Sequence, residues 1–141
     1  MTENKSLKEI MTKDVLTVHI KHKLSDVTRI FRENSIHHLP VLNGKKPVGM
    51  ISSQDVFKLV FNVDATDQRM LDSILDSNYN IEDTMTKELV IFDDASTIKD
   101  ATKILGEGSF HSVIVVDNKG DLNGIVTTTD LIQYLHNNIE S

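Results

Sequence analysis

Gly49-Met-Ile-Ser52-Ser-Gln-Asp55 returns 75 residues later as Gly124-Ile-Val-Thr127-Thr-Thr-Asp130. Outward from this pair, Met11-Thr12-Lys13 returns as Met85-Thr86-Lys87 at a spacing of 74. Further matches lie between the two motifs, at Asp26/Asp100, His37/His111 and Val41/Val115. Self-similarity at a fixed period indicates a duplicated structural unit that stacks on its copy. The sequence therefore predicts two similar halves related by a pseudo-two-fold axis, with a groove where they meet.

Length and composition limit the class of protein. A chain of 141 residues with 39% apolar side chains can bury the core of one compact domain, or of two half-domains that share a core. It has no cysteine, which excludes disulfides and thiolate metal sites. No apolar run is long enough to span a bilayer, and the polar start lacks the apolar stretch of a secretory signal. These features predict a cytoplasmic protein without a membrane partner.

Charge is distributed unevenly along the chain. The net charge is −6, but residues 1–50 carry nine Lys or Arg against five Asp or Glu, and the remaining residues carry six against sixteen. A protein that binds a nucleic-acid backbone needs a basic face, and the absence of Trp leaves little surface for base stacking. We therefore expect no nucleic-acid partner, although the basic first half can hold one small anion.

Both copies predict the element order β-α-β-β-α. Short apolar runs predict strands at 15–18, 39–42 and 48–51, and again at 89–92, 113–116 and 122–126. An apolar stripe at helical spacing predicts the first helix of each copy, at Leu24, Val27, Ile30 and Phe31 and at Ile98, Ala101, Ile104 and Leu105. Asp55 and Asp130 lie in the first turn of each closing helix. The predicted fold class is α/β (α+β), with two β-α-β-β-α repeats packed with pseudo-two-fold symmetry.

The predicted domain boundaries are residues 1–66 for the first repeat, 67–80 for a joining helix and 81–141 for the second repeat. Ser6 and Asn80 are candidate caps for a short helical turn that opens each repeat. Asp64 or Thr66 is the expected cap of the joining helix, whose apolar residues are Met70, Leu71, Ile74 and Leu75. Two roles stay open for this helix, a cover over the groove or part of a subunit interface.

The repeated Gly-x-x-Ser/Thr-x-x-Asp motif carries the chemistry. Ser52 with Asp55, and Thr127 with Asp130, place a hydroxyl and a carboxylate on the first turn of a helix that follows a strand. An ionised carboxylate can accept two hydrogen bonds from a vicinal diol, and the free N–H groups of a helix start suit a phosphate or sugar oxygen. The alternative is an ordinary helix cap. Recurrence of the motif at matched places favours a ribonucleotide site.

Two further stretches belong with these motifs, namely Ile10-Met-Thr-Lys-Asp-Val-Leu-Thr-Val18 and Ile36-His-His-Leu-Pro-Val41. Taken together, the motifs resemble a tandem pair of cystathionine-β-synthase (CBS) domains, called a Bateman module. The resemblance covers Leu7 to about His136, apart from the joining segment. It implies adenosyl ligands, namely AMP, ADP, ATP or sometimes S-adenosylmethionine, in up to two clefts between the repeats. It also implies a homodimer and regulation of a partner, here an unknown effector protein, without catalysis.

Carried over to this sequence, the resemblance implies a role for each matching residue. Asp55 and Asp130 would bind ribose hydroxyls, and Ser52 and Thr127 would bind ribose or phosphate. The remaining implied contacts are with the base: Val15, Leu16, Leu89 and Val90 would pack on adenine, and Met50 and Ile125 would flank it.

The expected phosphate partners differ from the pattern of the family. Nucleotide-binding members often have a His-Arg pair before the Leu-Pro-Val-like strand, whereas this chain has His37-His38 and, in the second copy, His111. Arginine is always charged, but an imidazole is only partly charged at neutral pH. Phosphate binding should therefore be weaker or pH-dependent, and Lys45 and Lys46 are the alternative contacts.

No metal site or catalytic centre is expected. Adjacent residues on a strand point to opposite faces, so His37 and His38 cannot readily bind one ion, and His19 and His22 lack a nearby third ligand. No activated nucleophile, P-loop or paired-carboxylate motif occurs. Three functions stay open: a module regulated by an adenine nucleotide, a dimerisation or interaction scaffold that needs no ligand, and a sensor of S-adenosylmethionine.

Overall fold

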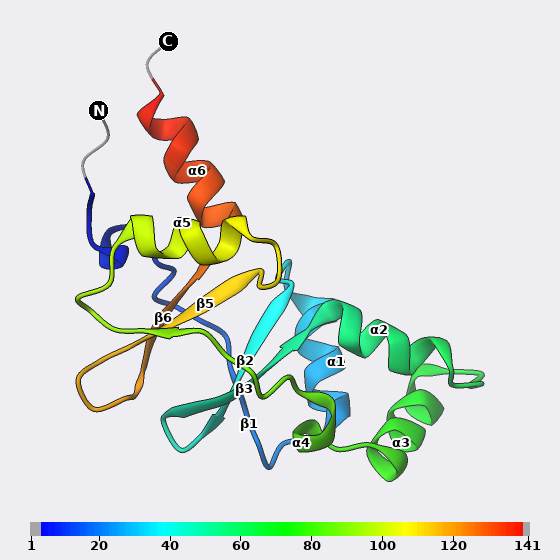
Figure 1. Cartoon of the computed structure of the whole chain (residues 1–141). Coiled ribbons are helices and arrows are strands. Elements are labelled where there is room, and N and C mark those ends of the chain that lie inside the picture. Colours follow the sequence, from blue (N-terminus) through cyan, green and yellow to red (C-terminus); the bar gives the residue numbers. More distant parts are fainter. Residues whose placement is uncertain (1–3, 140–141) are drawn as a thin grey trace. The chain divides into compact units, whose positions relative to one another are not determined.

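A computed structural model describes residues 4–139 and divides the chain into two compact units (Figure 1). The N-terminal unit is Leu16–Glu88, and the C-terminal unit combines the segment up to Val15 with the chain from Leu89 onward. Each unit contains one three-stranded sheet. In the part of the chain that the structure describes, no helix is long and apolar enough to cross a membrane.

The N-terminal unit confirms the order β-α-β-β-α and adds the joining helix. Its elements are β1 (Val18–His19), α1 (Leu24–Glu33), β2 (His38–Asn43), β3 (Lys46–Ser52), α2 (Ser53–Phe61), α3 (Gln68–Asn78) and α4 (Ile81–Thr84). The sheet order is β1-β2-β3, with β1 parallel and β3 antiparallel to β2. The helix α3 packs against α1 and α2, and its Leu75 is fully buried in the core of this unit.

The C-terminal unit repeats this order without a counterpart of α3. Its elements are a short 3₁₀ helix (Leu7–Glu9), β4 (Ile91–Phe92), α5 (Ile98–Gly106), β5 (Ser112–Val116), β6 (Leu122–Thr127) and α6 (Thr128–Asn138). The sheet order is β4-β5-β6, again with one parallel and one antiparallel pairing. Its core is formed by Leu7, Met11, Ile98, Ala101, Leu105, Val113, Val115 and Val126.

The compact units do not coincide with the contiguous repeats of the sequence, because the two repeats exchange their opening segments. The opening segment of the first repeat ends at Val15 and belongs to the C-terminal unit, and that of the second repeat ends at Glu88 and belongs to the N-terminal unit. Thr12 pairs with β6, donating its N–H to Ile125 O (2.8 Å) and accepting from Ile125 N–H (3.1 Å). Thr86 pairs in the same way with Met50 on β3, at 2.8 and 3.0 Å. Each Met-Thr-Lys segment thus forms a bridge to the last strand of the other sequence copy. The sequence boundaries at residues 66 and 80 remain a prediction, and their outer ends at 1–3 and 140–141 lie outside the described residues.

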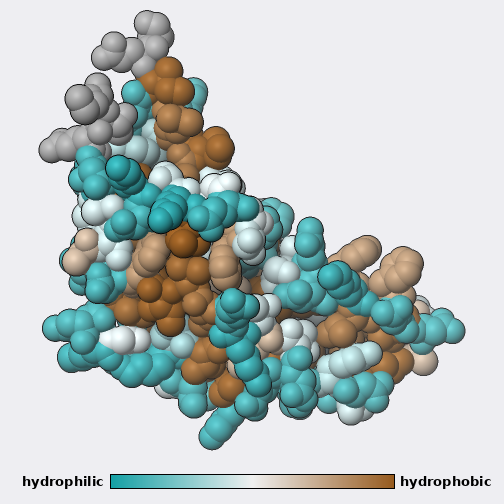
Figure 2. All heavy atoms as spheres, viewed as in Figure 1, coloured by the Kyte–Doolittle hydropathy of each residue, from teal (hydrophilic) through white to brown (hydrophobic). Residues whose placement is uncertain are grey.

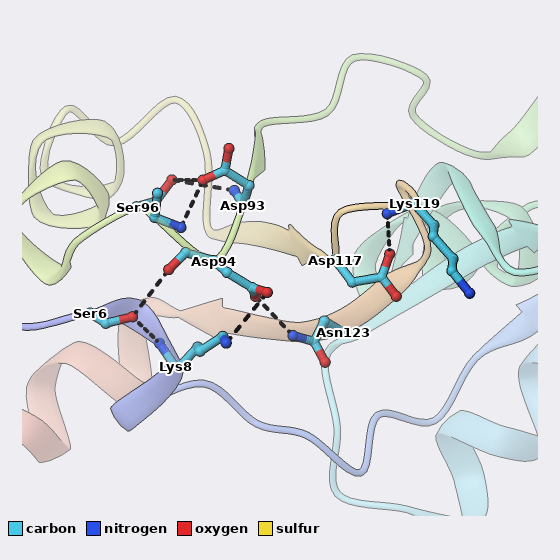
Figure 3. A network of polar contacts seen from close by, with 9 residues as sticks. Ser6, Lys8, Asp93, Asp94, Ser96, Asp117, Lys119 and Asn123 are labelled. Atoms are coloured by element: carbon cyan, nitrogen blue, oxygen red, sulfur yellow. Dashed lines mark hydrogen bonds and ion pairs between the residues drawn. The ribbon is translucent and has the colours of Figure 1, made fainter.

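Side-chain contacts hold the opening segment against the C-terminal unit (Figure 3). Ser6 Oγ donates to the Asp94 carbonyl (3.4 Å), Lys8 Nζ pairs with Asp94 Oδ2 (3.4 Å), and Asn123 Nδ2 donates to Asp94 Oδ1 (3.0 Å). Leu7, between the two anchoring side chains, is fully buried. Polar contacts therefore fix the register in which Leu7 enters the core.

The glycines of the repeated motif are required by this exchange. A Cβ built on Gly49 would lie 2.7 Å from Met85 Cγ, and one built on Gly124 would lie 2.8 Å from the Thr12 carbonyl oxygen. Atoms this close cannot coexist without a shift of the segment. In each unit the space beside this glycine is filled by the methionine of a Met-Thr-Lys segment, Met85 at Gly49 and Met11 at Gly124.

Two local predictions were wrong. The first strand of each copy is shorter than expected, because only Val18 and His19 pair with β2 and only Ile91 and Phe92 pair with β5. The joining helix is capped by Asp67, whose carboxylate accepts from Met70 N–H (2.8 Å), rather than by Asp64 or Thr66. The caps predicted at Ser6 and Asn80 are confirmed.

Candidate functional site

The hydroxyl and carboxylate of each repeated motif form a reciprocal cap at a helix start. In the N-terminal unit, Asp55 N–H donates to Ser52 Oγ (3.1 Å) and Ser52 N–H donates to Asp55 Oδ2 (2.9 Å). In the C-terminal unit, Asp130 N–H donates to Thr127 Oγ1 (3.3 Å) and Thr127 N–H donates to Asp130 Oδ2 (2.8 Å). This is a capping box with Asp in place of Glu. The predicted positions in the first turn are confirmed, and the cap explains one oxygen of each carboxylate.

A third capping box in the same chain, at the start of α5, is a reference for capping without a predicted ligand. At the start of α5, Asp100 N–H donates to Thr97 Oγ1 (3.2 Å) and Thr97 N–H donates to Asp100 Oδ2 (2.9 Å). Hydrogen bonds from the backbone and side chain of Thr97 lower the pKa of Asp100 below its ordinary value of 3.8. Asp100 is exposed, whereas Asp55 and Asp130 are half-buried. A capping box of this kind therefore stabilises a helix start by itself, and its presence alone does not assign a binding role to Asp55 or Asp130.

Asp130 has a second contact that marks it out. Thr12 Oγ1 donates to Asp130 Oδ1 at 3.4 Å, close to the outer limit for such a bond. The backbone pairing between Thr12 and Ile125 brings the hydroxyl to this place. Thr12 itself is exposed. The C-terminal unit thus gathers two hydroxyls and one carboxylate at a corner formed by β6, α6 and the opening segment.

The corresponding corner of the N-terminal unit contains Ser52, Asp55 and Thr86. The backbone of Thr86 pairs with Met50 as Thr12 pairs with Ile125. Within residues 4–139, however, no hydrogen bond joins the Thr86 hydroxyl to Asp55. Sequence reasoning did not single out Thr12 or Thr86 as site residues, although the exact repetition of Met-Thr-Lys was the available sign.

The residues expected to contact adenine divide between the two units. Val15, Leu89 and Val90 belong to the C-terminal unit and are half-buried, whereas Leu16 belongs to the N-terminal unit and is 43% exposed. Val90 O accepts from Ile114 N–H (2.9 Å), which fixes this stretch to β5. The residues expected to flank the base, Met50 and Ile125, are only 9% and 7% exposed within their own units. Their contact with a base remains a prediction.

The backbone of each histidine expected to contact phosphate lies next to one of the two capping boxes. His37 O accepts from Ser53 N–H (3.0 Å), and His111 O accepts from Thr128 N–H (3.3 Å). His38 lies opposite Ser52 in the ladder between β2 and β3. The side chains of His37 and His111 are exposed, and that of His38 is half-buried. All three histidines are therefore next to a helix start that can hold an anion.

The alternative lysine contacts lie at the other end of the same ladder. Lys46 pairs with Asn43 at the hairpin turn, six residues along β3 from Ser52. At about 3.3 Å per residue this is roughly 20 Å. Lys45 and Lys46 are thus far from the Ser52–Asp55 corner of their own unit, and both are exposed. The histidines are the better candidates at this corner.

The remaining histidine pair has a structural role. His19 N–H donates to His22 Nδ1 (2.9 Å), and Gly44 N–H donates to His19 Nε2 (3.1 Å), which ties the loop after β1 to the β2–β3 turn. Lone pairs used in this way are not offered to an ion. Among residues 4–139, no group of three or more His, Asp or Glu has the arrangement of a metal site.

Two units of β-α-β-β-α order, each closing with strand, Ser/Thr-x-x-Asp and helix, define a duplicated α/β module. The chain belongs to the CBS domain family, whose pattern matches residues 7–62 and 81–137. The sequence-based identification of a CBS pair is therefore confirmed.

Individual relatives agree with this assignment. The chain is 32% identical over 152 residues to the uncharacterized protein MJ1426 of Methanocaldococcus jannaschii, covering 92% of this chain and 90% of the relative. Three further relatives are longer, and the chain spans only 24% to 48% of them.

Solved structures of CBS pairs share the fold. CBSX2 in complex with AMP is 23% identical with a TM-score of 0.76, covering 94% of this chain and 97% of that one. The CBS domain pair of protein MJ0100 in complex with 5′-methylthioadenosine and S-adenosyl-L-methionine is 22% identical with a TM-score of 0.78, covering 97% and 100%. At these identities the likeness establishes the fold alone.

Proposed function

We propose that this chain is a non-catalytic regulatory module that binds an adenine nucleotide (AMP, ADP or ATP) between its CBS repeats and signals occupancy to a partner protein. The observation that carries the proposal is the hydrogen bonding of the Asp130 carboxylate. Its Oδ2 accepts the bond that caps α6, while the one bond to its Oδ1 within residues 4–139 is a long one from the Thr12 hydroxyl, at 3.4 Å. An oxygen held so weakly can accept a ribose hydroxyl in place of Thr12. The adenosyl ligands of two relatives of the same fold support this chemistry.

The test is isothermal titration of the full chain with AMP, ADP, ATP, S-adenosylmethionine and 5′-methylthioadenosine. Asp130→Ala should weaken nucleotide binding by roughly 1.5–3 kcal/mol, or about 10- to 150-fold, because a charged acceptor is lost. Asp100→Ala is the matched control, since it breaks an equivalent capping box at α5. It should leave nucleotide affinity unchanged. Equal losses of affinity in both variants would mean that Asp130 acts only through the stability of its helix.

Asp55 and Ser52 would serve a second and weaker cleft. Among the described residues, no hydroxyl of the exchanged segment bonds to the Asp55 carboxylate as Thr12 bonds to Asp130, so the Asp55 carboxylate is less ordered for a ribose diol. Asp55→Ala should therefore reduce the number of bound nucleotides from two to one, or leave the tighter site unaffected. Loss of the tighter site in Asp55→Ala, with Asp130→Ala unaffected, would reverse this assignment.

The histidines beside the caps would contact the phosphate. Because a protonated imidazole pairs with phosphate better than a neutral one, AMP should bind more tightly as the pH falls from 8 towards about 6.5. Adenosine, which has no phosphate, should show little trend. His38→Arg should flatten the alkaline side of the AMP profile and tighten AMP binding at pH 8. Equal pH profiles for AMP and adenosine would remove the histidines from the phosphate site.

One alternative function has support from the structure. The capping boxes account for Ser52, Asp55, Thr127 and Asp130 without any ligand, which favours an interaction scaffold that needs none. Thermal melting of the full chain with the same set of ligands separates the alternatives. A rise in melting temperature with nucleotide supports the regulatory module, a rise only with S-adenosylmethionine supports a sensor of that compound, and no response to any ligand supports the scaffold.

A homodimer is part of the proposal. Phe57 and Phe61 on α2 are 66% and 77% exposed, with ring centroids 6.1 Å apart, so two aromatic side chains form one apolar surface. Such rings are favoured at interfaces between subunits. Light scattering should show a dimer of the 15.9 kDa chain, and Phe57→Ser with Phe61→Ser should shift it towards monomer. A wild-type monomer at tens of micromolar would contradict this.

A further inference from the structure

An apolar groove opens between α5 and α6 of the C-terminal unit. It has a volume of about 470 Å³, and its walls include Thr102 and Leu105 of α5 and Leu131, Ile132 and Leu135 of α6. Ile132 and Leu135 are 60% and 56% exposed. Apolar atoms are visible along α6 in Figure 2. Single exposed apolar residues are ordinary, but a continuous groove of them indicates a surface that another molecule covers.

The duplication provides the same groove a second time, and there it is covered. In the N-terminal unit, the counterparts of these residues line a smaller hollow of about 280 Å³ between α1 and α2. Gln68 and Leu71 of α3 form part of its wall. The cover is evident in the exposure of one matched pair: Thr28 is 6% exposed, whereas Thr102, its counterpart 74 residues later, is exposed. The chain therefore contains its own example of what fits this groove, an amphipathic helix.

A polar contact defines the occupant further. Asp76 of α3 accepts hydrogen bonds from Ser25 N–H (2.9 Å) and Ser25 Oγ (2.7 Å) at the start of α1. In the C-terminal unit the counterpart of Ser25 is Lys99, whose N–H donates to Asn4 Oδ1 at the longer distance of 3.4 Å. A carboxylate on an incoming helix would meet both this N–H and the Lys99 ammonium group. The open groove thus favours a more acidic partner than the covered one does.

We propose that the α5–α6 groove binds an amphipathic helix of a partner protein built like α3, with leucines at positions i and i+4 and a carboxylate at i+5. The two leucines fill the groove as Leu71 and Leu75 cover α1 and α2, and the carboxylate displaces Asn4 from the start of α5. Recognition of this kind uses a few apolar anchors on one helix face. The groove borders the Thr127–Asp130 corner at Thr128, but neither Thr127 nor Asp130 lines it, so this docking does not require a bound nucleotide.

The probe is a fluorescent, end-capped peptide of residues 66–79, which carries the sequence of α3. Titrated with the full chain, it should bind saturably, and the amide NMR signals of α5 and α6 should shift. Replacing its two leucines with alanine should weaken binding more than about 10-fold, because the apolar surface that fills the groove is lost. Changing its Asp76 to Asn should weaken binding about 2- to 5-fold and remove most of the salt dependence.

Protein variants locate the site. Ile132→Glu with Leu135→Glu should abolish peptide binding without unfolding the chain, since both side chains are exposed. Ile91→Glu is the control, because Ile91 is an apolar residue of the same unit that is 48% exposed and does not line the groove. It should leave peptide affinity unchanged.

Four results would overturn the proposal. These are no saturable binding at millimolar peptide, binding that survives Ile132→Glu with Leu135→Glu, an equal loss of binding in Ile91→Glu, and NMR shifts confined to α1 and α2. A wild-type dimer that fails to bind peptide, and that Ile132→Glu with Leu135→Glu converts to monomer, would assign the groove to a second copy of the chain instead.

Discussion

The two units share one fold but differ in what covers it. In the N-terminal unit, α3 lies over α1 and α2, and Asp76 caps α1 through Ser25. In the C-terminal unit the matching groove is open, and the Thr12 hydroxyl donates to Asp130 at the corner proposed to bind a ligand. Duplication has therefore preserved the residues that define each sheet and helix start, whereas contacts on the surface have diverged. We infer that the units have specialised differently, with the proposed ligand corner and the open groove both in the C-terminal unit.

The largest expected effect tests the exchange of opening segments. Leu7 and Ile81 are both fully buried, Leu7 in the core of the C-terminal unit and Ile81 in that of the N-terminal unit. Leu7→Ala and Ile81→Ala should each lower the free energy of unfolding by about 2–5 kcal/mol, measured by urea denaturation. Lys8→Ala, one residue away and exposed, should change it by less than about 0.5 kcal/mol.

Hydrogen exchange then tells the units apart. Leu7→Ala should lower amide protection first in β5 and β6, and Ile81→Ala should lower it first in β2 and β3. The opposite pattern would mean that each opening segment packs on the repeat that follows it in the sequence. It would contradict the exchange of opening segments between the repeats.

The next effect concerns the two motif glycines. Gly49→Ala and Gly124→Ala should each destabilise the chain by about 1–3 kcal/mol, because the added methyl group overlaps the exchanged segment. The three atoms nearest to an added methyl group at Gly49 all belong to the Met85 side chain, whereas at Gly124 they include the Thr12 carbonyl oxygen. Met85→Ala should therefore relieve most of the overlap in Gly49→Ala, while Met11→Ala relieves only part of it in Gly124→Ala. A double-mutant cycle measures the coupling, and equal relief in both pairs would erase this difference between the units.

A smaller effect separates the two ligand corners. Thr12→Val removes the hydroxyl that contacts Asp130, and Thr86→Val removes the matching hydroxyl that contacts no carboxylate in the described chain. If the proposed function is correct, Thr12→Val should weaken binding at the tighter nucleotide site by about 1 kcal/mol, or roughly 5-fold, because Thr12 orients the Asp130 carboxylate before the ribose hydroxyl replaces it. Thr86→Val should leave it unchanged. Calorimetry on both variants decides, and matching changes would show that the corners are equivalent.

The local sequence pattern predicted most of the helices and strands, but at the Thr127–Asp130 corner it predicted the capping residues and not Thr12. Helical spacing predicted α1 and α5, and the motif spacing predicted the caps at Ser52 and Thr127, because these structures depend on neighbours three or four residues away. The sequence could not predict the exchange, since an apolar segment does not specify which sheet edge it will pair with. Thr12 was missed for the same reason, because its bond to Asp130 joins residues 118 positions apart. Val15 and Leu16 were expected in a strand because they are apolar, yet the ladder to β2 begins only at Val18.

The smallest effect is electrostatic, and it tests whether a capping box without a ligand role behaves as a cap. In the folded chain, hydrogen bonds from Thr97 lower the pKa of Asp100 below 3.8. A carboxyl group whose pKa is depressed on folding binds its proton more weakly in the folded state, so its contribution to stability is present above the unfolded pKa and is lost as the pH falls through the folded pKa. The difference in unfolding free energy between wild type and Asp100→Asn should therefore be constant near neutral pH and shrink below about pH 4. NMR titration of the carboxyl carbon should show the lowered pKa directly, and Thr97→Val should raise it only part of the way, because the bond from the Thr97 backbone remains. A pKa for Asp100 at or above 3.8 would show that the box at α5 does not stabilise the charged carboxylate, and Asp100 would then be a poor control for Asp130.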